Sequence, residues 1–575
     1  MTLQLREGTW HPEGERVRGV PIFAFAEDDG VPHIPGPMIR VDAGAEVRVT
    51  LRNTLRKRAV VHGLHDHDGR ADSVVLGAGE TREVRFRATT VGTHFYWART
   101  TVSARPIGTG EDSQLVGAFV VDDPSHPRAA DRVLVISVFD DTVPAPRFPA
   151  GHLQVFALNG RSWPRTERYD YALGDTVRWR LINGSNHVHP MHLHGHFFTV
   201  GSKGTAWSDT VYAPAQRRQA VTEFLLNATS TQITWVADRP GNWLFHCHMI
   251  SHMDVTLRLD SAAAMGTHSA HGRLEDSMAG LVAAITIRDR RPSAARAARA
   301  SAPNAAVARR RVFVTERAVA AGVSAMSYVL QEGDGEPAAD SVRLPGSTLV
   351  LHQGEPTAIT VINRAREATA VHWHGLELDS YYDGVAGWSG ADSRTAPMIA
   401  PGDSFVVRLT PTRAGTFIYH THQGEGTQLR AGLYGALLVL PPGEARDTTE
   451  RLVMLTDPPP GAPANAPTGA VGGSLTPAPI ELRAGVAHRL RFISIGATLP
   501  KRITLREDST VVTWRVIAKD GATVADSQRD ERSATMPFGV GETVDVELRR
   551  DRPGTLTLDI LTNGKDLMHV PVIVR

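Results

Sequence analysis

The chain has 575 residues, of which 42% are hydrophobic and 21% charged, and this composition is typical of a globular protein. At about 150 residues per domain, the length predicts roughly four domains. The formal net charge of +1 gives no electrostatic reason to expect nucleic acid or an anionic membrane as a partner. There is no run of about 18 apolar residues, so no membrane span is expected. The single cysteine excludes an intrachain disulfide.

Short alternating apolar runs, separated by many Gly and Pro residues, favour an all-β protein. In residues 1–125 such runs lie at 46–51 (EVRVTL), 83–87 (EVRFR) and 117–121 (GAFVV). Residues 126–288 repeat the pattern at 132–138 (RVLVISV), 175–183 (DTVRWRLIN) and 281–287, where a segment rich in Ala, Met and His (261–277) precedes the last strand. The pattern of short strands in each of these two regions therefore predicts one β-sandwich.

Residues 289–311 are rich in Ala, Arg, Ser and Pro and have weak apolar periodicity, so we expect a linker there. The strand pattern resumes in 312–442, for example at 357–363 (TAITVIN), and continues in 443–575 at 543–548 and 570–574. The sequence thus predicts four sandwich domains, 1–125, 126–288, 312–442 and 443–575.

The two halves of the chain resemble each other when 60–121 is aligned with 372–439. This alignment places His62 on His374 and matches 93–99 (THFYWAR) with 416–422 (TFIYHTH). We therefore expect two copies of a two-domain unit.

The only cysteine lies in the sequence His246-Cys247-His248, which is followed by His252. Because a strand sends alternate side chains to opposite faces, Cys247 would point one way and the two flanking histidines the other. One face could then offer a thiolate to one copper, and the other could offer two imidazoles to a second metal centre. The alternative is that Cys247 is a small buried hydrophobic residue.

Three further histidine clusters have similar spacing. The four clusters are His189/His192/His194, His246/His248/His252, His372/His374 and His420/His422. A closed zinc site needs about four ligands, and here there are more. Thiolate with two imidazoles and a weak thioether is the composition of a blue-copper site, and the remaining imidazoles suffice for a cluster of several metals. Any single pair could instead be core or surface histidines.

With these clusters, HWHG, HTH, HPMHLHG and HCHMISH, the chain resembles the multicopper oxidases, the family that includes laccases. The resemblance implies an all-β fold of four consecutive cupredoxin-like Greek-key β-sandwich domains. It also implies four coppers per chain, one type 1, one type 2 and two type 3. A small-molecule donor would supply electrons at the type 1 copper, and O2 would be reduced to water at the other three.

The resemblance assigns a role to each cluster residue. His189, Cys247 and His252 would bind the type 1 copper, with His252 towards the substrate. His192 and His372 would bind the type 2 copper. The type 3 pair would be bound by His194, His246, His248, His374, His420 and His422.

Two further residues take roles from the same resemblance. The closing Met-x-Gly pattern of the family reappears at Met278, which we expect as axial type 1 ligand, with Leu257 as the alternative and core packing as the other possibility. Replacing Met278 by Leu should then raise the type 1 potential. Asp383 matches an acid beside the cluster in relatives and is expected to help supply protons for O2 reduction, although it could be a plain Asp-Gly turn.

The first and last domains depart from the family pattern. In the first, the ligand positions are taken as Val60, His62, Trp97 and Arg99, so no copper cluster is expected there. Two more histidines of that domain, His65 and His67, are interpreted as solvated. In the last domain His488 and His569 are interpreted as structural. The second and third domains would therefore build the three-copper cluster together, within one chain rather than between chains.

The leading function is oxidation of phenols or aromatic amines coupled to O2 reduction. The alternatives are oxidation of Cu(I), a copper nitrite reductase, and a non-catalytic copper-binding protein. Met265, His268 and His271 could line a route for Cu(I), but a mobile loop is the preferred interpretation of these residues. The protein could be a monomer or a homo-oligomer. The resemblance implies a periplasmic or secreted location, although the start MTLQLREGTW has no basic-then-apolar signal.

Overall fold

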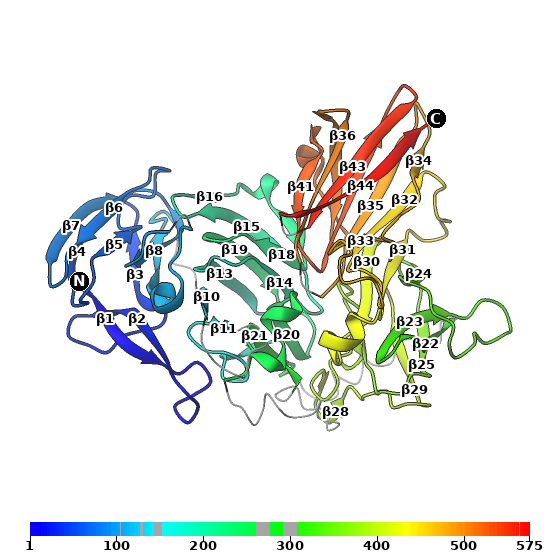
Figure 1. Ribbon diagram of the computed structural model, residues 1–575, viewed down its shortest axis with the longest axis horizontal. Helices are drawn as coiled ribbons and strands as arrows, with labels where there is room; N and C mark the ends of the chain where they lie inside the picture. Colours follow the sequence, from blue (N-terminus) through cyan, green and yellow to red (C-terminus); the bar gives the residue numbers. More distant parts are fainter. Residues whose placement is uncertain are drawn as a thin grey trace.

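In the part of the chain that the structure describes, eight β-sheets form four consecutive pairs along the sequence (Figure 1). The computed structural model describes residues 1–103, 105–126, 130–142, 152–259, 277–290, 307–497, 499–562 and 564–575. In Figure 1 the first pair (blue) lies at one end, the second (cyan to green) in the middle, and the third and fourth (yellow-green and orange-red) side by side at the other end. The all-β fold predicted from the sequence is confirmed.

The first sandwich has two sheets. Their strand orders are β2 (Val20–Glu27), β1 (Thr2–Trp10), β4 (Ala45–Asn53), β7 (Thr81–Ala88), and β3 (Gly36–Asp42), β9 (Val116–Asp122), β8 (Gly92–Arg99), β5 (Ala59–His62), β6 (Ser73–Leu76). Strand β4 shows why these residues form a sheet. Val47, Val49 and Leu51 are buried, whereas the residues between them face outward, as a period of two requires.

The second sandwich carries most of the candidate ligands. Its sheets have the orders β11 (His152–Leu158), β10 (Arg132–Thr142), β13 (Thr176–Asn183), β19 (Thr229–Val236), β15 (Phe198–Thr205), β16 (Asp209–Val211), with β17 (Arg218–Ala220) on β15, and β12 (Arg168–Ala172), β21 (Val282–Arg288), β20 (Gly241–Cys247), β14 (His189–Leu193), β18 (Thr222–Leu225).

The third sandwich has the orders β23 (Val323–Leu330), β22 (Ala308–Ala320), β25 (Thr357–Asn363), β29 (Ser404–Leu409), and β24 (Gly346–His352), β31 (Tyr434–Leu440), β30 (Gly415–Thr421), β26 (Val371–His372). Its hairpin of β27 (Gly390–Ala391) and β28 (Arg394–Thr395) adds to the second sandwich, because Gly390 pairs with Asn242 of β20. The two sandwiches are therefore joined by a shared sheet.

The fourth sandwich has the orders β33 (Ala470–Val471), β32 (Glu450–Thr456), β35 (Ala487–Ser494), β42 (Glu542–Arg549), β38 (Thr513–Lys519), β39 (Ala522–Thr523), with β40 (Arg532–Ser533) on β38, and β34 (Ile480–Leu482), β44 (Asp566–Val574), β43 (Gly554–Thr562), β36 (Lys501–Glu507), β37 (Thr510–Val511), with β41 (Thr535–Phe538) on β36. The helical elements whose bounds lie within the described residues are short, at Gly110–Gln114, Pro214–Gln216, Ile250–His252, Val255–Leu257, Ser380–Tyr382, Glu425–Leu429 and Asp526–Gln528. Among the described residues no helix is long and apolar enough to span a membrane.

The strands expected from the alternating runs are present as β4, β7, β9, β10, β13, β21, β25, β42 and β44, with ends shifted by a few residues in places. The expected linker 289–311 needs a correction at its end. Strand β22 already begins at Ala308, because its first residues pair in parallel with β25 from Thr357 onward. Residues 291–306 lie outside the described residues, as do Met265, His268 and His271.

Each sandwich has its own hydrophobic core, and three further apolar clusters lie between sandwiches. The cluster that includes Leu244, Ile418 and Ile493 draws on the second, third and fourth sandwiches. Burial of these side chains holds the three sandwiches together around the histidine-bearing strands.

Candidate metal centres

Two pairs of neighbouring strands carry the predicted ligands. On β14 and β20 the register sets Met191 opposite Cys247 and His192 opposite His246. On β26 and β30 it sets His372 opposite His420. Because side chains alternate between the faces of a strand, Cys247 turns to one face and His246 to the other, as the sequence predicted.

The first group contains Cys247, His189 and His252. Cys247 Sγ lies 3.8 Å from His189 Nδ1 and 3.4 Å from His252 Nδ1, and the two Nδ1 atoms are 3.1 Å apart. Donors bound in a trigonal plane at about 2.0–2.3 Å from one ion would be separated by about 3.5 Å. The spacing therefore fits one metal ion between the three side chains.

Burial prepares this group for a metal. It raises the pKa of the Cys247 thiol to about 12, so the thiol is protonated until a metal displaces its proton. It lowers the pKa of His189 and of His252 well below the usual value, so both rings are neutral and can offer a lone pair. Ser185 Oγ lies 3.2 Å from His189 Nε2, the nitrogen that faces away from the sulfur, and so orients the ring.

The axial position of this group stays a prediction. Met278 is buried, but its side chain packs in the cluster with Ile250 and Met253. Leu257 packs, half-buried, against the cluster that contains Cys247.

Eight imidazoles from the second and third sandwiches form three more groups. The members of each group offer ligand atoms that all lie within 4.8 Å of one another, and the groups are His192/His194/His372, His194/His246/His422 and His248/His374/His420. Each group takes residues from both sandwiches. The two halves therefore meet within one chain, as expected, and we call these eight residues the histidine cage.

Hydrogen bonds fix which ring nitrogen of each imidazole faces the cage. The Nδ1 atoms of five rings contact oxygen atoms at 2.7–2.9 Å, and these pairs are His192 with Val221 O, His194 with Asp383 Oδ2, His246 with Cys247 O, His372 with Asp383 O, and His420 with Thr421 O. A ring that donates from Nδ1 keeps the lone pair of Nε2 for a metal.

The inward nitrogens are crowded and buried. His194 Nε2 lies 2.9 Å from His246 Nε2, and His192 Nε2 lies 3.4 Å from His372 Nε2. Burial lowers the pKa of His246 to about 4 and that of His420 to about 3, so these rings are neutral at pH 7. Within the described residues His420 Nε2, His374 Nδ1 and both nitrogens of His248 have no hydrogen-bond partner. Uncharged, converging and unsatisfied nitrogens fit a set of metal ligands.

Asp383 lies at the edge of the cage and is completely buried. Its Oδ2 is 2.8 Å from His194 Nδ1 and accepts a hydrogen bond from Ser389 Oγ, and its main-chain oxygen is 2.7 Å from His372 Nδ1. The turn expected at Asp383-Gly384 is therefore present, and the role of Asp383 in supplying protons stays a prediction. The residue ends a short turn before Gly384 (φ +90°), and that turn brings its carboxylate to two cage imidazoles.

The first sandwich corrects two interpretations. In the structure Val61 pairs with Ala98 and His62 with Trp97, just as Val371 pairs with Thr421 and His372 with His420. His62 is therefore equivalent to His372 rather than to His374, because the sequence alignment was two residues out of register. The ligand positions are occupied by His62, Leu64, Trp97 and Arg99.

The second correction concerns His65 and His67, which are buried rather than solvated. The rings of His65, His67 and His94 form a stack, with centroids 4.6 Å and 4.3 Å apart, behind Phe119. The stack faces Trp207 of the second sandwich, so the polar residues around it are covered by the domain contact. This could not be seen from a polar, turn-like sequence alone.

The histidines of the fourth sandwich have structural contacts. His488 is buried, its Nε2 accepts from Arg483 N, and its Nδ1 is 2.8 Å from Thr449 O. His569 is half exposed and pairs with Asp559. Among the described residues of this sandwich, and of the first, no three potential ligand side chains converge as in the four groups.

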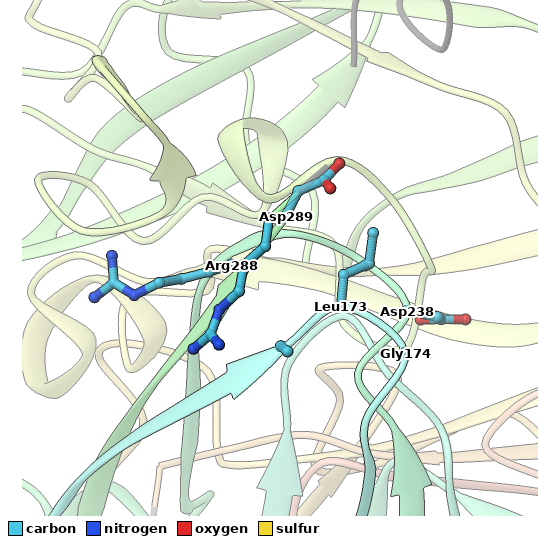
Figure 2. Close-up of a pocket in the computed structure, with 7 residues that line it drawn as sticks. Leu173, Gly174, Asp238, Arg288 and Asp289 are labelled. Atoms are coloured by element: carbon cyan, nitrogen blue, oxygen red, sulfur yellow. The ribbon is translucent and has the colours of Figure 1, made fainter. Parts of the chain in front are cut away.

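A surface pocket of about 450 Å³ lies elsewhere on the second sandwich. Figure 2 shows five of the residues that line it, Leu173, Gly174, Asp238, Arg288 and Asp289. None of the predicted ligands lines it. The predicted ligands therefore lie in the buried groups and not at this pocket.

Comparison with known proteins shows the family to which the chain belongs. Two family models, both described as multicopper oxidase, match residues 134–261 and residues 32–126 and 341–444, together more than half of the chain. The chain belongs to the multicopper oxidase family. Copper is the metal of this family, and the thiolate and imidazole donors fit it.

Individual relatives match over short stretches. Copper resistance protein A of Pseudomonas syringae pv. tomato is 37% identical over 20% of this chain and 18% of that protein. Laccase-5 of Arabidopsis thaliana is 39% identical over 17% of this chain and 16% of that protein. The aligned regions thus cover less than a fifth of these relatives. The structure of a blue copper oxidase from Nitrosomonas europaea is 21% identical, with a TM-score of 0.39, over 50% of this chain and 85% of that chain.

Sequence reasoning missed the residues that support the ligands. Phe156 stacks on the His252 ring at a centroid distance of 4.2 Å, and Thr222 Oγ1 lies 3.2 Å from both His192 Nδ1 and His374 Nε2. No motif marks either residue, because Thr222 reaches His192 through the pairing of β18 with β14, and Phe156 reaches His252 from a strand far away in the chain. The spacing of polar residues after β14 gives no signal for Thr222.

Proposed function

We propose that this multicopper oxidase takes single electrons from a small organic donor, a phenol or an aromatic amine, and uses four of them, with four protons from the donor and solvent, to reduce O2 to two waters. His189, Cys247 and His252 would hold the type 1 copper. The type 2 copper would lie at His192 and His372, and the type 3 pair at the other six imidazoles of the histidine cage. Copper, when bound, supplies one-electron redox chemistry at the first group and O2 reduction at the cage.

The observation that carries this proposal is the connection between the two centres. Cys247 belongs to the first group, and His246 and His248, its direct neighbours, belong to the cage. His246 Nδ1 also lies 2.9 Å from the carbonyl oxygen of Cys247. A few covalent bonds and one hydrogen bond thus join the thiolate to the cage, and a protein that only stored copper would not need this connection.

The chain's own residues divide the remaining tasks. The buried side chains around Cys247 exclude water from the thiolate. Phe156 covers His252, and His187 lies 5.7 Å from that ring and is about one-fifth exposed, so we place the approach of the donor on this side. Asp383 and the main-chain oxygens around the cage orient its imidazoles.

The test is to load the protein with copper and measure copper content, the visible spectrum and O2 uptake with a phenolic donor. We expect four coppers per chain, a blue band and O2 uptake in a 1:4 ratio to donor electrons. The Cys247→Ser variant should lose the blue band and donor oxidation while keeping copper in the cage. A blue protein that takes up no O2 with either a phenol or Cu(I) would contradict the proposal.

Oxidation of Cu(I) is the second candidate, favoured by similarity to proteins named copper resistance protein A. The two candidates differ in the donor, so turnover of Cu(I) against turnover of a phenolic dye separates them. We also propose a periplasmic or secreted location, which cell fractionation tests. Because each group is complete within one chain, we propose an active monomer. Size exclusion with activity on each fraction tests this choice against a homo-oligomer.

A further inference from the structure

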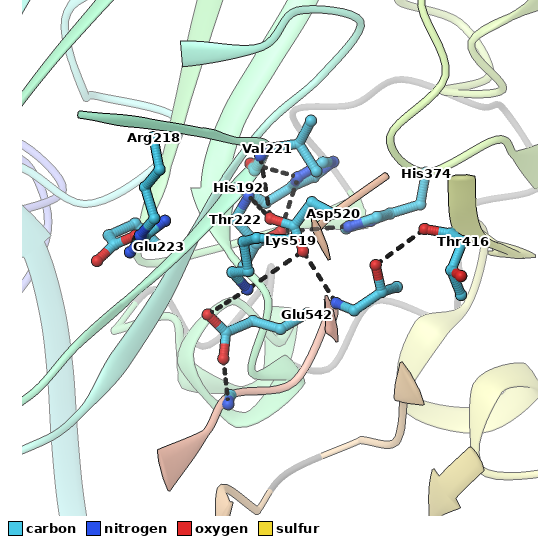
Figure 3. Close-up of polar contacts among 12 residues, drawn as sticks. His192, Arg218, Val221, Thr222, Glu223, His374, Thr416, Lys519, Asp520 and Glu542 are labelled. Carbon is cyan, nitrogen blue, oxygen red and sulfur yellow. Dashed lines mark hydrogen bonds and ion pairs between the residues drawn. The ribbon is translucent and has the colours of Figure 1, made fainter. Parts of the chain in front are cut away.

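The fourth sandwich offers no group of ligands within its described residues, yet it reaches the histidine cage. One connection is made by Asp520, at the turn between β38 and β39, which bonds to residues beside the cage. This side chain is buried, and the backbone of Asp520 has φ +49°, a left-handed conformation that Asp tolerates at a turn. The turn points the carboxylate across the domain boundary at residues 221 and 222 of the second sandwich (Figure 3).

The carboxylate of Asp520 accepts three main-chain hydrogen bonds. Its Oδ2 accepts from Val221 N at 3.1 Å and from Thr222 N at 3.0 Å, and its Oδ1 accepts from Thr543 N at 2.9 Å. Hydrogen bonds to a charged acceptor are stronger than those between neutral groups. Asp520 therefore ties residues 221 and 222 to strand β42 of the fourth sandwich.

Lys519 and Glu542 complete this contact. Lys519 Nζ lies 3.2 Å from Asp520 Oδ1 and donates to Glu542 Oε1 at 2.7 Å, while Glu542 Oε2 accepts from Gly539 N at 2.6 Å. All three charged side chains are buried. The Asp520 charge is thus matched by a neighbouring cation, and the turn is fixed on both sides (Figure 3).

Residues 221 and 222 in turn hold two cage imidazoles by the nitrogens that face away from the metal positions. Val221 O lies 2.9 Å from His192 Nδ1, and Thr222 Oγ1 lies 3.2 Å from His374 Nε2. The opposite nitrogens, His192 Nε2 and His374 Nδ1, are those left for a metal. The two rings stack with centroids 3.8 Å apart, although they belong to different groups of the cage.

The fourth sandwich also touches a third imidazole. Gly541 (φ +81°) packs on His248, and a Cβ at this position would lie 2.5 Å from Cδ2 of that ring. Only glycine fits so close to the ring in this conformation. Two separate segments of the fourth sandwich therefore support the cage, Asp520 through residues 221 and 222 and Gly541 by direct contact with His248.

We infer that Asp520 and Thr222 are positioning residues, through which the ligand-free fourth sandwich sets the geometry of the histidine cage. The inference rests on the proposed function, because it assigns copper to the cage. It gives the fourth sandwich a role in a centre to which it contributes no ligand. Partners that hold the second nitrogen of a ligating histidine affect metal affinity or activity by about 10–100-fold when removed.

The experiment compares Asp520→Ala, Asp520→Asn and Thr222→Val with Asp545→Ala in the full chain. Asp545 is the matched control, because it is also a buried carboxylate between the third and fourth sandwiches, where it accepts from Thr416 Oγ1 and Arg491 Nη1 but has no contact with residues 221 and 222. Copper affinity is measured by competition with a chelator, copper content per folded chain by elemental analysis, and the thiolate centre by its visible band.

We expect the copper affinity of the cage to fall about 10–100-fold in Asp520→Ala and Thr222→Val, while the visible band of the Cys247 centre keeps its position and intensity. Asp520→Asn keeps an oxygen for the two amide groups and should recover part of the affinity. If Asp520→Ala does not fold, the copper affinities of Asp520→Asn and Thr222→Val still test the inference. Asp545→Ala should unfold more easily but keep its copper per folded chain.

The inference is overturned if the Asp520 and Thr222 variants bind copper like wild type, if Asp545→Ala loses as much copper, or if the thiolate band falls in parallel. It is also overturned if the wild-type cage binds no copper. O2 uptake is scored separately. A wild type that binds copper in the cage but consumes no O2 would contradict the proposed function, and the copper affinities would still judge the inference.

Discussion

The first and third sandwiches share one backbone arrangement around a histidine, which we call the local frame, but the side chains around that histidine have different functions. In each, an asparagine nine residues before the equivalent histidine closes the preceding turn: Asn53 Nδ2 donates to Lys57 O, and Asn363 Nδ2 donates to Glu367 O, both at 2.8 Å. The histidine then contacts a main-chain oxygen by Nδ1, His62 that of Asp72 at 3.2 Å and His372 that of Asp383 at 2.7 Å. The frame that orients an imidazole is therefore present in both sandwiches.

The side chains around that frame differ. His372 faces His420 edge to face, whereas His62 stacks flat on Trp97 with centroids 5.1 Å apart. Trp97 Nε1 donates to Pro106 O, and the ring packs between the first and second sandwiches. The local frame alone therefore does not make a metal site. The first sandwich uses the same face to bind its neighbour, and the third uses it to build the cage.

The largest effect should come from giving the third sandwich the residue of the first. His374→Leu introduces the side chain that the first sandwich carries as Leu64. We expect the His248/His374/His420 group to lose its copper and O2 uptake to fall by more than the about 10–100-fold typical of outer-shell changes, while the visible band at Cys247 remains. Copper content and O2 uptake measure this.

The reciprocal variant, Leu64→His, is the control for this prediction. It should gain no copper, because Trp97 and Arg99 still occupy the other positions. A gain of one tightly bound copper per chain in Leu64→His would show that the local frame with one added histidine is enough for a metal site, and would contradict the conclusion drawn from the two sandwiches.

Next in size is the loss of the tryptophan itself. Trp97→Ala removes a buried ring from the interface between the first two sandwiches, and truncation of such a ring costs about 3–5 kcal/mol of stability. Denaturant unfolding should detect the loss as an early transition, while copper per folded chain stays at the wild-type value. Loss of copper from the folded fraction would mean that the first sandwich takes part in the metal centres.

Asp383→Asn should have a smaller effect on function. Asp383 Oδ2 is 2.8 Å from His194 Nδ1, and Asn offers a neutral and weaker acceptor there. We expect reoxidation by O2 to slow about 10–100-fold, while reduction of the thiolate centre by donor is unchanged. Stopped-flow absorption at the blue band measures both rates. Asp72→Asn, the exposed equivalent in the first sandwich, should change neither rate.

The ligand pairs were predictable from the sequence because each lies in one short stretch of chain, whereas their assignment to shared groups came from the family resemblance. Cys247 with its two neighbours, and each His-x-His pair, occupy the ends of strands, and a period of two already tells which side chains share a face. The fold class followed from the same alternation. Each of these features depends on residues that are close in the chain.

The features that were missed depend on distant pairing. The two-residue register error at His62 arose because sequence letters were aligned without the pairing of β5 with β8. The ring of His65 is covered by Trp207 of the second sandwich, and the contact of Asp520 with Thr222 joins residues about 300 positions apart. Such contacts leave no periodic signal in one sequence.

The smallest effect concerns the stacked histidines of the first sandwich. Burial lowers the pKa of His94 to about 4, against 6.5 for an exposed ring. Between pH 4 and 6.5 the unfolded chain therefore binds a proton that the folded chain does not, so His94 makes the protein less stable as the pH falls through this window and not above it. His94→Phe should reduce the slope of unfolding free energy against pH by about 1.4 kcal/mol per pH unit.

The control is Tyr96→Phe on the same strand, which removes the hydroxyl that donates to Pro37 O and should lower stability equally at all pH values in this window. Denaturant titrations at several pH values measure both slopes. An unchanged slope in His94→Phe would mean that His94 binds its proton equally in the folded and unfolded chains, so that burial in the first sandwich would not lower its pKa as burial in the third lowers that of His420.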